Sequence, residues 1–394
     1  MPLEYVAGNR LTLLKNGEQY FPALIGAIDA ARREVFVETY LFADDETGGA
    51  VASALARAAA RGVDVHLLLD GFGGRDFEPR FRDTLERAGA QVLVFRPKIS
   101  PLTLRRSRLR RMHRKIACFD AALAFVGGIN VIDDYDTPGQ TPPRYDYAVR
   151  VEGPLAAQAR YQAARLWSSV AWATLGRRWP GFADPARWRT PRSALDISPA
   201  CGDCSAALAL RDSLRHRRDI EDAYLEEIGR ARIEVVIANA YFFPGRHFRR
   251  ALRAAAARGV RVVLLLQGRV EYTLLHYASR ALYRGLLKAG VEIHEYQRSF
   301  LHAKVAVFDS RVATVGSSNI DPFSFMMAKE ANLFVDDAAF AGQLRASLGE
   351  AIESGARQVR LQRWLRLSWW LRLRIGLAYA TARLMMAIAG YGKG

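Results

Sequence analysis

Five residues with reactive or turn-forming character occur twice in the chain at identical spacing. Residues 113–130 read HRKIACFDAALAFVGGIN, and residues 302–319 read HAKVAVFDSRVATVGSSN. In both segments His is followed by Lys after two positions, Asp after seven, Gly after fourteen and Asn after seventeen. Five matches at equal spacing are not expected by chance, so we expect the two segments to fold alike and to act together.

The residue types within each segment predict a phosphate-binding site. His and Lys two positions apart on a strand point to the same face, and a hairpin would return the Asn to that face. Two such hairpins would surround one point with two imidazoles, two ammonium groups and two amides, supplied by His113, Lys115, Asn130, His302, Lys304 and Asn319. A pocket with two fixed positive charges and no acid suits a phosphodiester.

These side chains also suggest a mechanism without metal or cofactor. One imidazole can attack phosphorus while the other protonates the leaving oxygen and then takes a proton from an incoming alcohol. The two lysines neutralise the charge that a metal would otherwise neutralise. Asp120 and Asp309 complete the motif and are counted with its catalytic candidates, but they lie on the strand face opposite to their His. We therefore expect them to hold loops by backbone hydrogen bonds.

The segments around the motif also repeat, and they indicate the fold class. Residues 31–42 resemble residues 231–242, and Ala58–Gly71 resembles Ala255–Gly268. The second pair reads as the end of an Ala-rich helix, an Arg-Gly stop and a continuous apolar strand. This alternation predicts an α/β protein with two homologous lobes that share one active site, each lobe a mostly parallel sheet flanked by helices.

We expect the chain to divide into four segments. The first lobe covers residues 1–155, a helical and loop connector covers 156–204, and the second lobe covers 205–355. Within the connector, Leu155–Thr174 is predicted to be helical. Residues 356–394 form a basic amphipathic segment that is expected to associate with membranes.

The charge balance indicates an anionic partner. The 394 residues include 57 Lys or Arg against 40 Asp or Glu, a net charge of +17, which suits nucleic acid, an anionic membrane surface or phosphorylated substrates. Residues 96–115 hold nine Lys or Arg, no acid and no aromatic residue. Leu102, Leu104, Leu109 and Met112 are interleaved with these basic residues, which favours a membrane-inserting loop. The lack of aromatics argues against a binding site for single-stranded nucleic acid, whose bases stack on aromatic side chains. The three cysteines exclude a disulfide framework, and Cys201 and Cys204 lack the second pair of a zinc site.

Residues 356–394 leave two interpretations open. They carry eight Lys or Arg, no acid, and the three tryptophans Trp364, Trp369 and Trp370. This composition is typical of a helix in a membrane interface, with Arg at the phosphates and Trp at headgroup depth. The alternative is a last helix packed on the body of the protein. No stretch of about 20 uncharged apolar residues is present, so we expect no plain membrane span.

The HxKxxxxD motif, present twice, resembles the phospholipase D superfamily, and the resemblance covers essentially residues 8–350. Asn16–Tyr20, Ile237–Gly245 and Gly316–Pro322 further resemble its bacterial cardiolipin synthase branch, the B type in particular. The resemblance implies two α/β lobes that each supply one motif to a shared site. It also implies a phosphohistidine intermediate.

The resemblance further implies a role for each site residue. His113 would be the nucleophile and His302 the general acid and base, although the pseudo-symmetry permits the reverse. The phosphate oxygens would be bound by Lys115, Lys304, Asn130 and Asn319. In relatives an acid farther along the chain orients each His ring, and Asp146 after the first motif and Glu330 after the second fit this role. Gly128 stands where many relatives have Ser, so the first half-site lacks a hydroxyl.

The implied activity is cardiolipin synthesis. A phosphatidyl group would pass from one phosphatidylglycerol to another, giving cardiolipin and glycerol, and the family also allows phosphatidylglycerol to form from phosphatidylethanolamine and glycerol. The same site acting with water would make a phospholipase or a nuclease, and a third alternative is a non-catalytic lipid-binding protein. The expected partners are anionic phospholipids and a membrane surface, without nucleic acid. The expected location is peripheral, on the cytoplasmic side of a bacterial inner membrane, and the oligomeric state stays open.

Overall fold

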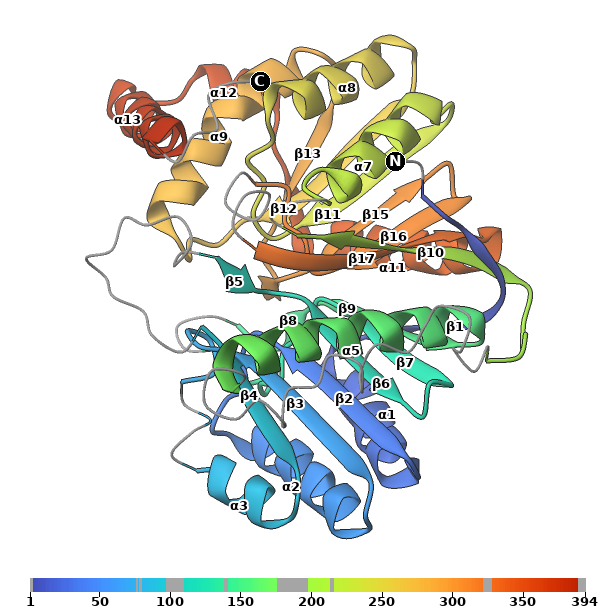
Figure 1. The fold of residues 1–394 in the computed structure, drawn as a ribbon. Coiled ribbons are helices and arrows are strands. Elements are labelled where there is room, and N and C mark those ends of the chain that lie inside the picture. The colour runs from blue at the N-terminus through green and yellow to red at the C-terminus, as the bar shows by residue number, and fades with distance from the viewer. Residues whose placement is uncertain are drawn as a thin grey trace.

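Two lobes of similar design stack on each other, the first blue to green and the second yellow to red in Figure 1. The computed structural model describes residues 3–75, 77, 80–96, 110–137, 141–175, 198–212, 216–321 and 328–388. The two-lobe α/β prediction is confirmed.

The described part of the first lobe consists of strands and helices that alternate along the chain. Its strands are β1 (Val6–Lys15), β2 (Glu34–Thr39), β3 (Asp64–Asp70), β4 (Gln91–Phe95), β5 (Arg111–Met112), β6 (Lys115–Phe119), β7 (Leu123–Gly127), β8 (Arg144–Tyr145) and β9 (Tyr147–Glu152). Its helices are α1 (Asn16–Ala30), α2 (Glu46–Ala60), α3 (Arg82–Arg87) and α5 (Pro154–Leu175).

The second lobe repeats this order and then extends it. Its strands are β10 (Cys204–Arg211), β11 (Glu234–Asn239), β12 (Arg261–Gln267), β13 (Glu292–Tyr296), β14 (Phe300–Leu301), β15 (Lys304–Phe308), β16 (Val312–Gly316), β17 (Ala328–Asp336) and β18 (Ala356–Gln358). Its helices are α7 (Asp219–Arg230), α8 (Arg246–Ala257), α9 (Thr273–Leu287), α11 (Ala338–Gly355), α12 (Leu361–Leu365) and α13 (Trp369–Ile388).

The sheets are mixed, which corrects the expectation of mostly parallel strands. In the first lobe β2, β3 and β4 are parallel, because helices α2 and α3 return the chain between them. Strands β6, β7, β9 and β1 are antiparallel to their neighbours, because a tight turn joins β6 to β7. The second lobe has the same pattern, and the antiparallel pairing of β1 with β10 joins both lobes into one continuous sheet.

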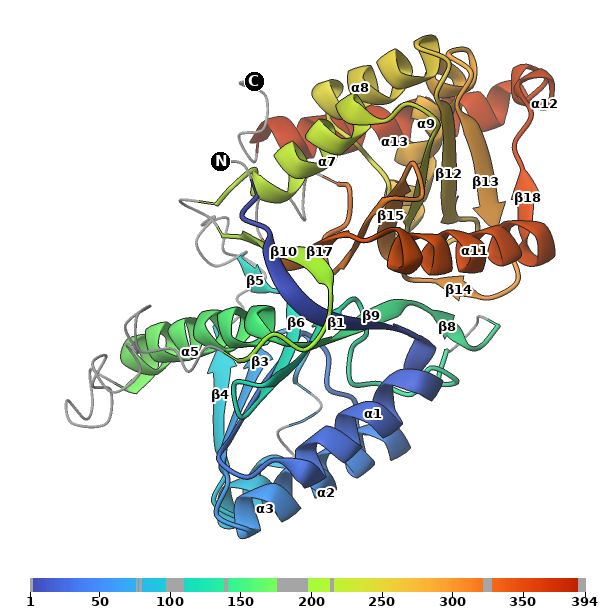
Figure 2. The same ribbon diagram turned by 90° about the vertical axis from the view of Figure 1, so that its right-hand side faces the viewer.

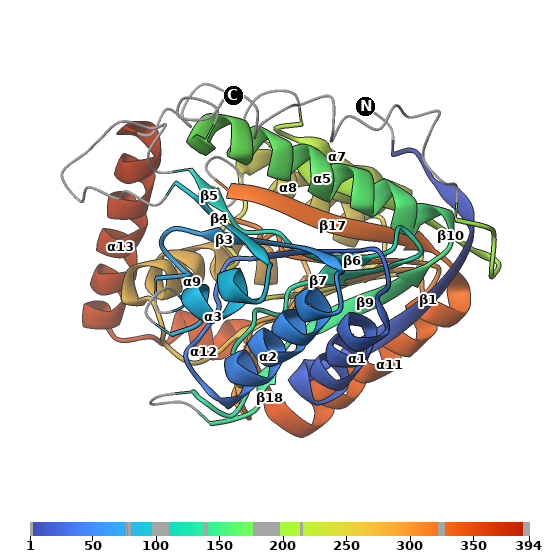
Figure 3. The same cartoon turned by 60° about the horizontal axis from the view of Figure 1, so that its bottom comes forward.

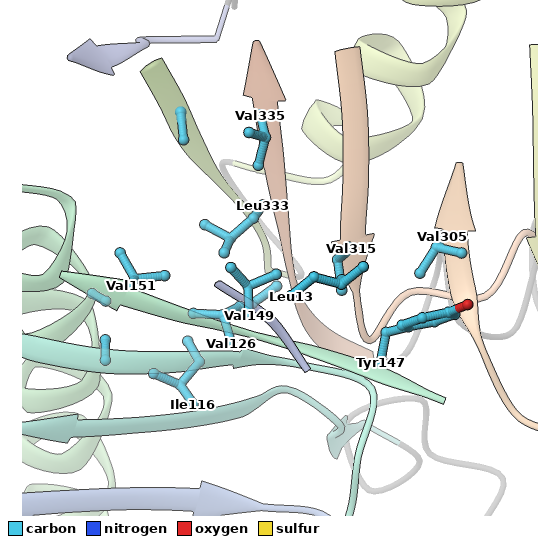
Figure 4. Close-up of a cluster of buried hydrophobic side chains, with 14 of the residues drawn as sticks. Leu13, Ile116, Val126, Tyr147, Val149, Val151, Val305, Val315, Leu333 and Val335 are labelled. Atoms are coloured by element: carbon cyan, nitrogen blue, oxygen red, sulfur yellow. The ribbon is translucent and has the colours of Figure 1, made fainter. Parts of the chain in front are cut away.

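A hydrophobic core lies between the two lobes. Leu13, Val126 and Val149 of the first lobe face Val315 and Leu333 of the second (Figure 4). Helices α5 and α11 pack on this shared core, whereas α1 to α3 and α7 to α9 cover the outer faces (Figure 2). Helix α5 was expected within the connector, and it packs on the first lobe in the way that α11 packs on the second.

The remaining connector and the end of the chain are only partly described. Residues 176–197 of the connector and 389–394 at the end lie outside the described residues. Among the described helices, none is both long and apolar enough to cross a membrane.

Asp120 and Asp309 each hold a turn to the start of a neighbouring strand. The Asp120 carboxylate accepts hydrogen bonds from the backbone N–H groups of Arg32, Arg33 and Glu34 at 2.8–3.0 Å. The Asp309 carboxylate accepts three such bonds at 2.8–2.9 Å, from Arg232, Ile233 and Glu234. Both residues follow the end of their strand farthest from the motif His. These hydrogen bonds are the ones expected of residues that hold loops.

We expect Asp120→Ala to lower the free energy of unfolding by about 1–3 kcal/mol, because three backbone donors lose a charged acceptor. Urea unfolding measures this difference. The control is Asp29→Ala, which removes an exposed ion pair with Arg57 and should cost less than about 1 kcal/mol. Equal losses in the two variants would contradict the structural role of Asp120.

Candidate active site

Each motif His is reached by a short strand that pairs with the other lobe. Strand β5 runs parallel to β17 of the second lobe, and β14 runs parallel to β8 of the first. The backbone N–H of His113 donates to the carbonyl of Lys329 at 2.9 Å, and that of His302 donates to the carbonyl of Tyr145 at 2.9 Å. The two lobes thus exchange strands immediately before their histidines.

The exchange pairs each histidine with an acid of the other lobe. His113 Nδ1 lies 3.1 Å from Glu330 Oε2, and His302 Nδ1 lies 2.6 Å from Asp146 Oδ2. Chain order had assigned each acid to the histidine that precedes it, and the structure corrects this assignment. The cause is the register of the exchanged strands, since Lys329 and Tyr145 are the residues just before the two acids. With Nδ1 bonded to a carboxylate, Nε2 of each ring is the atom that can meet phosphorus.

The two motif lysines are buried beside the histidines. Lys115 is 4% exposed and its Nζ donates to the carbonyl of His113 at 2.6 Å. Lys304 is fully buried, donates to the carbonyl of His302, and lies 3.7 Å from Asp146 Oδ2. Burial lowers the pKa of Lys115 to about 7, and it also lowers the pKa of Lys304. The site therefore holds its cations with little solvation to stabilise them.

The acids are ionised and the imidazoles are neutral near pH 7. Burial, followed by the neighbouring Lys304 cation, lowers the pKa of His302 to about 3. Burial also lowers the pKa of His113, against the opposing effect of Glu330. For Asp146, burial raises the pKa, but Lys304 and His302 outweigh it and the net pKa is lowered. The pKa of Glu330 is lowered in the same way, by His113 and Lys115 against burial.

The two asparagines of the motif are buried in turns that follow the hairpins. Asn130 is 6% exposed, and its Oδ1 accepts from the backbone N–H of Leu41 at 3.2 Å. Asn319 is 4% exposed, and its Oδ1 has no hydrogen-bond partner among the described residues. A phosphate oxygen can accept a hydrogen bond only from Nδ2 of these amides, because Oδ1 is an acceptor.

The missing hydroxyl of the first half-site has a steric explanation. Ser317 donates to Glu330 Oε2 at 2.5 Å, which supports that carboxylate. At the corresponding Gly128, a Cβ atom would lie 2.4 Å from Asp146 Oδ1. A side chain at this position would therefore require the Asp146 carboxylate to move from its place beside His302.

Two residues that contact the site, Tyr40 and Asn16, were not predicted from the sequence to do so. The ring of Tyr40 packs edge-to-face on His113 with centroids 4.8 Å apart, and Lys115 Nζ lies 5.5 Å from its centre. Asn16 exchanges two hydrogen bonds with Asp146, from its own N–H to the Asp146 carbonyl at 2.9 Å and from the Asp146 N–H to its Oδ1 at 3.2 Å. Tyr40 follows a parallel strand, the usual place for ligand contacts, and this signal could have identified it.

Part of the chain that leads to the site lies outside the described residues. Of the basic segment before His113, residues 97–109 lie outside the described residues. In the part of the chain that is described, no group of three or more His, Cys, Asp or Glu side chains could hold a metal ion.

Comparison with known proteins gives relatives along the whole chain. Cardiolipin synthase B of Escherichia coli (strain K12) is 38% identical over 392 residues, covering 99% of this chain and 92% of that protein. Cardiolipin synthase A of Pseudomonas putida (strain KT2440) is 33% identical over 356 residues, covering 90% and 70%.

Solved structures share the fold at low sequence identity. The phosphatidylserine synthase of Haemophilus influenzae superposes with a TM-score of 0.72 at 14% identity, covering 98% of this chain and 96% of that chain. The polyphosphate kinase of Porphyromonas gingivalis superposes with a TM-score of 0.57 at 14% identity, covering 90% and 49%.

A family profile matches both lobes separately. The family described as "Cardiolipin synthase, PLD-like domain" matches residues 24–164 and residues 224–351, and each match includes one His, its Lys, its Asn and the acid that follows. The chain belongs to this family of phospholipase D-like cardiolipin synthases.

Proposed function

We propose that the protein transfers a phosphatidyl group between two phosphatidylglycerol molecules through a phosphohistidine, giving cardiolipin and glycerol. The main support is the pair of neutral imidazoles, each held at Nδ1 by an ionised acid of the other lobe, with two buried lysines beside them. The names of the relatives supply the substrate class.

The first half-reaction uses both histidines. Nε2 of His113 attacks phosphorus, the bond from phosphorus to the glycerol oxygen breaks, and His302 gives its proton to that oxygen. The lysines and asparagines stabilise the charge on the phosphate oxygens. In the second half-reaction, the hydroxyl of the acceptor gives its proton to His302 and attacks phosphorus, and the bond to His113 breaks.

The contacts of the two acids favour this assignment of roles. Asp146 lies 2.6 Å from His302 and stabilises an imidazolium directly, as a general acid requires. Glu330 lies 3.1 Å from His113 and also accepts from Ser317, so less of its charge is available to that ring. Burial and Lys304 hold the pKa of His302 at about 3 in the empty site, so this ring gains its proton when an anionic substrate offsets the lysine charge.

Product analysis separates transfer from hydrolysis, which would use the same residues. The purified protein is incubated with phosphatidylglycerol vesicles, without added metal, and the products are identified by mass spectrometry. Cardiolipin with free glycerol is the expected result. Phosphatidic acid as the sole lipid product would make the protein a phospholipase and contradict the transferase.

We expect His113→Ala and His302→Ala each to lower kcat by at least about 10³-fold, because each removes a reacting group. Glu330→Gln and Asp146→Asn should lower kcat by roughly 10²- to 10⁴-fold, because the imidazolium loses its partner. The control is Glu226→Gln, an exposed acid on α7 whose loss should leave kcat unchanged. Near-normal turnover in either His variant would refute the shared site.

The low pKa of Lys115 predicts a pH-dependent anion affinity. A dianion binds the protonated ammonium, and with a pKa of about 7 the protonated fraction rises as pH falls. Sulfate does not titrate in this range, so its affinity should rise about tenfold from pH 8 to pH 6, as calorimetry would measure. Lys115→Met should remove this dependence, whereas Lys288→Met on the surface should keep it. A flat profile in the unmodified protein would contradict the role of Lys115.

We further propose that the protein acts at the surface of a membrane, on its cytoplasmic side, where anionic lipids attract basic proteins. Helix α13 packs on α9 through Ile375, Ala382 and Met386 (Figure 3). Its other face leaves large apolar side chains exposed, at Trp369, Trp370, Leu373, Leu377, Leu384 and Met385. Helix α13 thus combines the two interpretations of the C-terminal segment, because one face packs on the body and the other suits lipid.

The surroundings of α13 support the same placement. A pocket of about 750 Å³ beside it is lined by Arg357, Arg360, Arg363 and Arg366, which suit lipid phosphates. Helix α13 lies on the side of the molecule where β5 leads into His113 (Figures 1 and 3).

Replacing Trp370 and Leu377 together by Gln should weaken binding to phosphatidylglycerol vesicles at least about tenfold, because both side chains are about 60% exposed and lose apolar contact with lipid. Sedimentation with vesicles measures the binding. The control is Ile233→Gln, an equally apolar side chain, 70% exposed, just before β11. Unchanged binding of the double variant would exclude this face as the membrane contact.

A further inference from the structure

The two half-sites differ at the residue that follows the central strand of each lobe. After β2 this residue is Tyr40, whose ring covers His113 and Lys115. After β11 it is Ala240, which is buried and whose N–H donates to the carbonyl of Ala303 at 3.0 Å. Beside His113 this position is filled by a tyrosine ring, whereas the corresponding position near His302 holds only the methyl group of Ala240.

A pocket opens at this position in the second lobe. It is lined by the ends of β11 and β12 and by the start of α9, including Ala240, Tyr241, Gln267, Glu271, Tyr272 and His276. Gln267 Nε2 donates to the carbonyl of Leu301 at 3.4 Å. Leu301 and Ala303 flank His302, so the pocket is built against the segment that carries this histidine.

The size of the pocket restricts its occupant. The space in it that is open to the centres of water molecules is about 30 Å³, roughly enough for two waters. A small hydroxyl-bearing group such as the end of an alcohol suits this space.

The polar groups of the pocket accept hydrogen bonds from an alcohol. The Glu271 carboxylate accepts from the Tyr241 hydroxyl and retains further acceptor capacity. Burial lowers the pKa of His276 to about 4, so its imidazole is neutral and offers an acceptor nitrogen. Arg269 also lines the pocket, but its Nε donates to the carbonyl of Gln297 at 2.8 Å.

Glu271 also lies within electrostatic range of the phosphate site. Burial raises its pKa, whereas Tyr241, Arg144 and Lys304 lower it. A carboxylate in this place accepts hydrogen bonds from hydroxyl donors. The pocket thus complements a neutral polyol next to a cationic site that complements the diester.

We propose that this pocket is the acceptor subsite, where Glu271 accepts a hydrogen bond from a polyol headgroup whose reacting hydroxyl then faces His302. The proposal rests on the function proposed above and names the group that receives the phosphatidyl chain. A bound polyol holds its hydroxyl in place and excludes water from the phosphohistidine, which favours transfer over hydrolysis. Because Tyr40 occupies the corresponding place in the first lobe, the two half-sites have different tasks.

The test compares how the phosphohistidine is partitioned between an alcohol and water. Glu271→Gln weakens the acceptor, and Ala240→Tyr fills the pocket with the side chain found in the other lobe. With phosphatidylglycerol vesicles, both variants should lower the ratio of cardiolipin to phosphatidic acid about tenfold or more. With phosphatidylethanolamine vesicles and free glycerol as the acceptor, both should raise the KM for glycerol by a similar factor.

Matched controls separate this effect from general damage. Glu353→Gln, an exposed acid on α11, should keep both the product ratio and the KM for glycerol. Thermal unfolding shows whether Ala240→Tyr folds, and Glu271→Gln tests the proposal independently of that variant. An unchanged product ratio and KM in Glu271→Gln, while the unmodified protein makes cardiolipin, would overturn the acceptor subsite alone. If the unmodified protein makes no cardiolipin, the proposed function fails and this inference fails with it.

Discussion

The exchange of short strands between the lobes determines the geometry of the whole site. His113 belongs to the first lobe through β6, but its backbone and ring are bonded to Lys329 and Glu330 of the second. His302 has the reverse arrangement with Tyr145 and Asp146. Both imidazoles are therefore fixed relative to both lobes, and the continuous sheet and shared core keep the lobes from shifting. Reactions that need two groups on opposite sides of one phosphorus depend on such positioning.

The same exchange of strands brings two buried lysines and two buried acids together, so that their charges compensate each other. Lys304 and Glu330 are fully buried, and Lys115 and Asp146 are nearly so, which is costly unless the charges compensate each other. Two ammonium groups and two carboxylates balance when both lysines are charged. Solvation is weak, however, and the pKa of Lys115 falls to about 7. An anionic diester supplies the charge that lets the lysines and His302 hold their protons, so the site is electrostatically complete only with its substrate.

Most of the reactive residues of the site could be predicted from the sequence, because the duplicated motif contains them at identical spacing. His113 and Lys115 lie within electrostatic range of Lys304, as the duplicated motif predicts. The place of Asn130 and Asn319 at the phosphate stays a prediction. The pairing of acids with histidines was wrong, since it depends on strands of two residues whose partners lie in the other half of the chain. The contact of Tyr40 with His113 and the pocket near Ala240 were also not predicted from the sequence, because they depend on side chains that meet only in the folded lobes.

The strand exchange also has a consequence for the protein as it is synthesised. The first lobe emerges from the ribosome with His113 and Lys115 in place, but Glu330 and the strand that pairs with β5 are more than 200 residues away. A nascent first lobe therefore lacks the carboxylate that is bonded to the His113 ring. The complete set of contacts around both histidines forms only when the second lobe has folded onto the first.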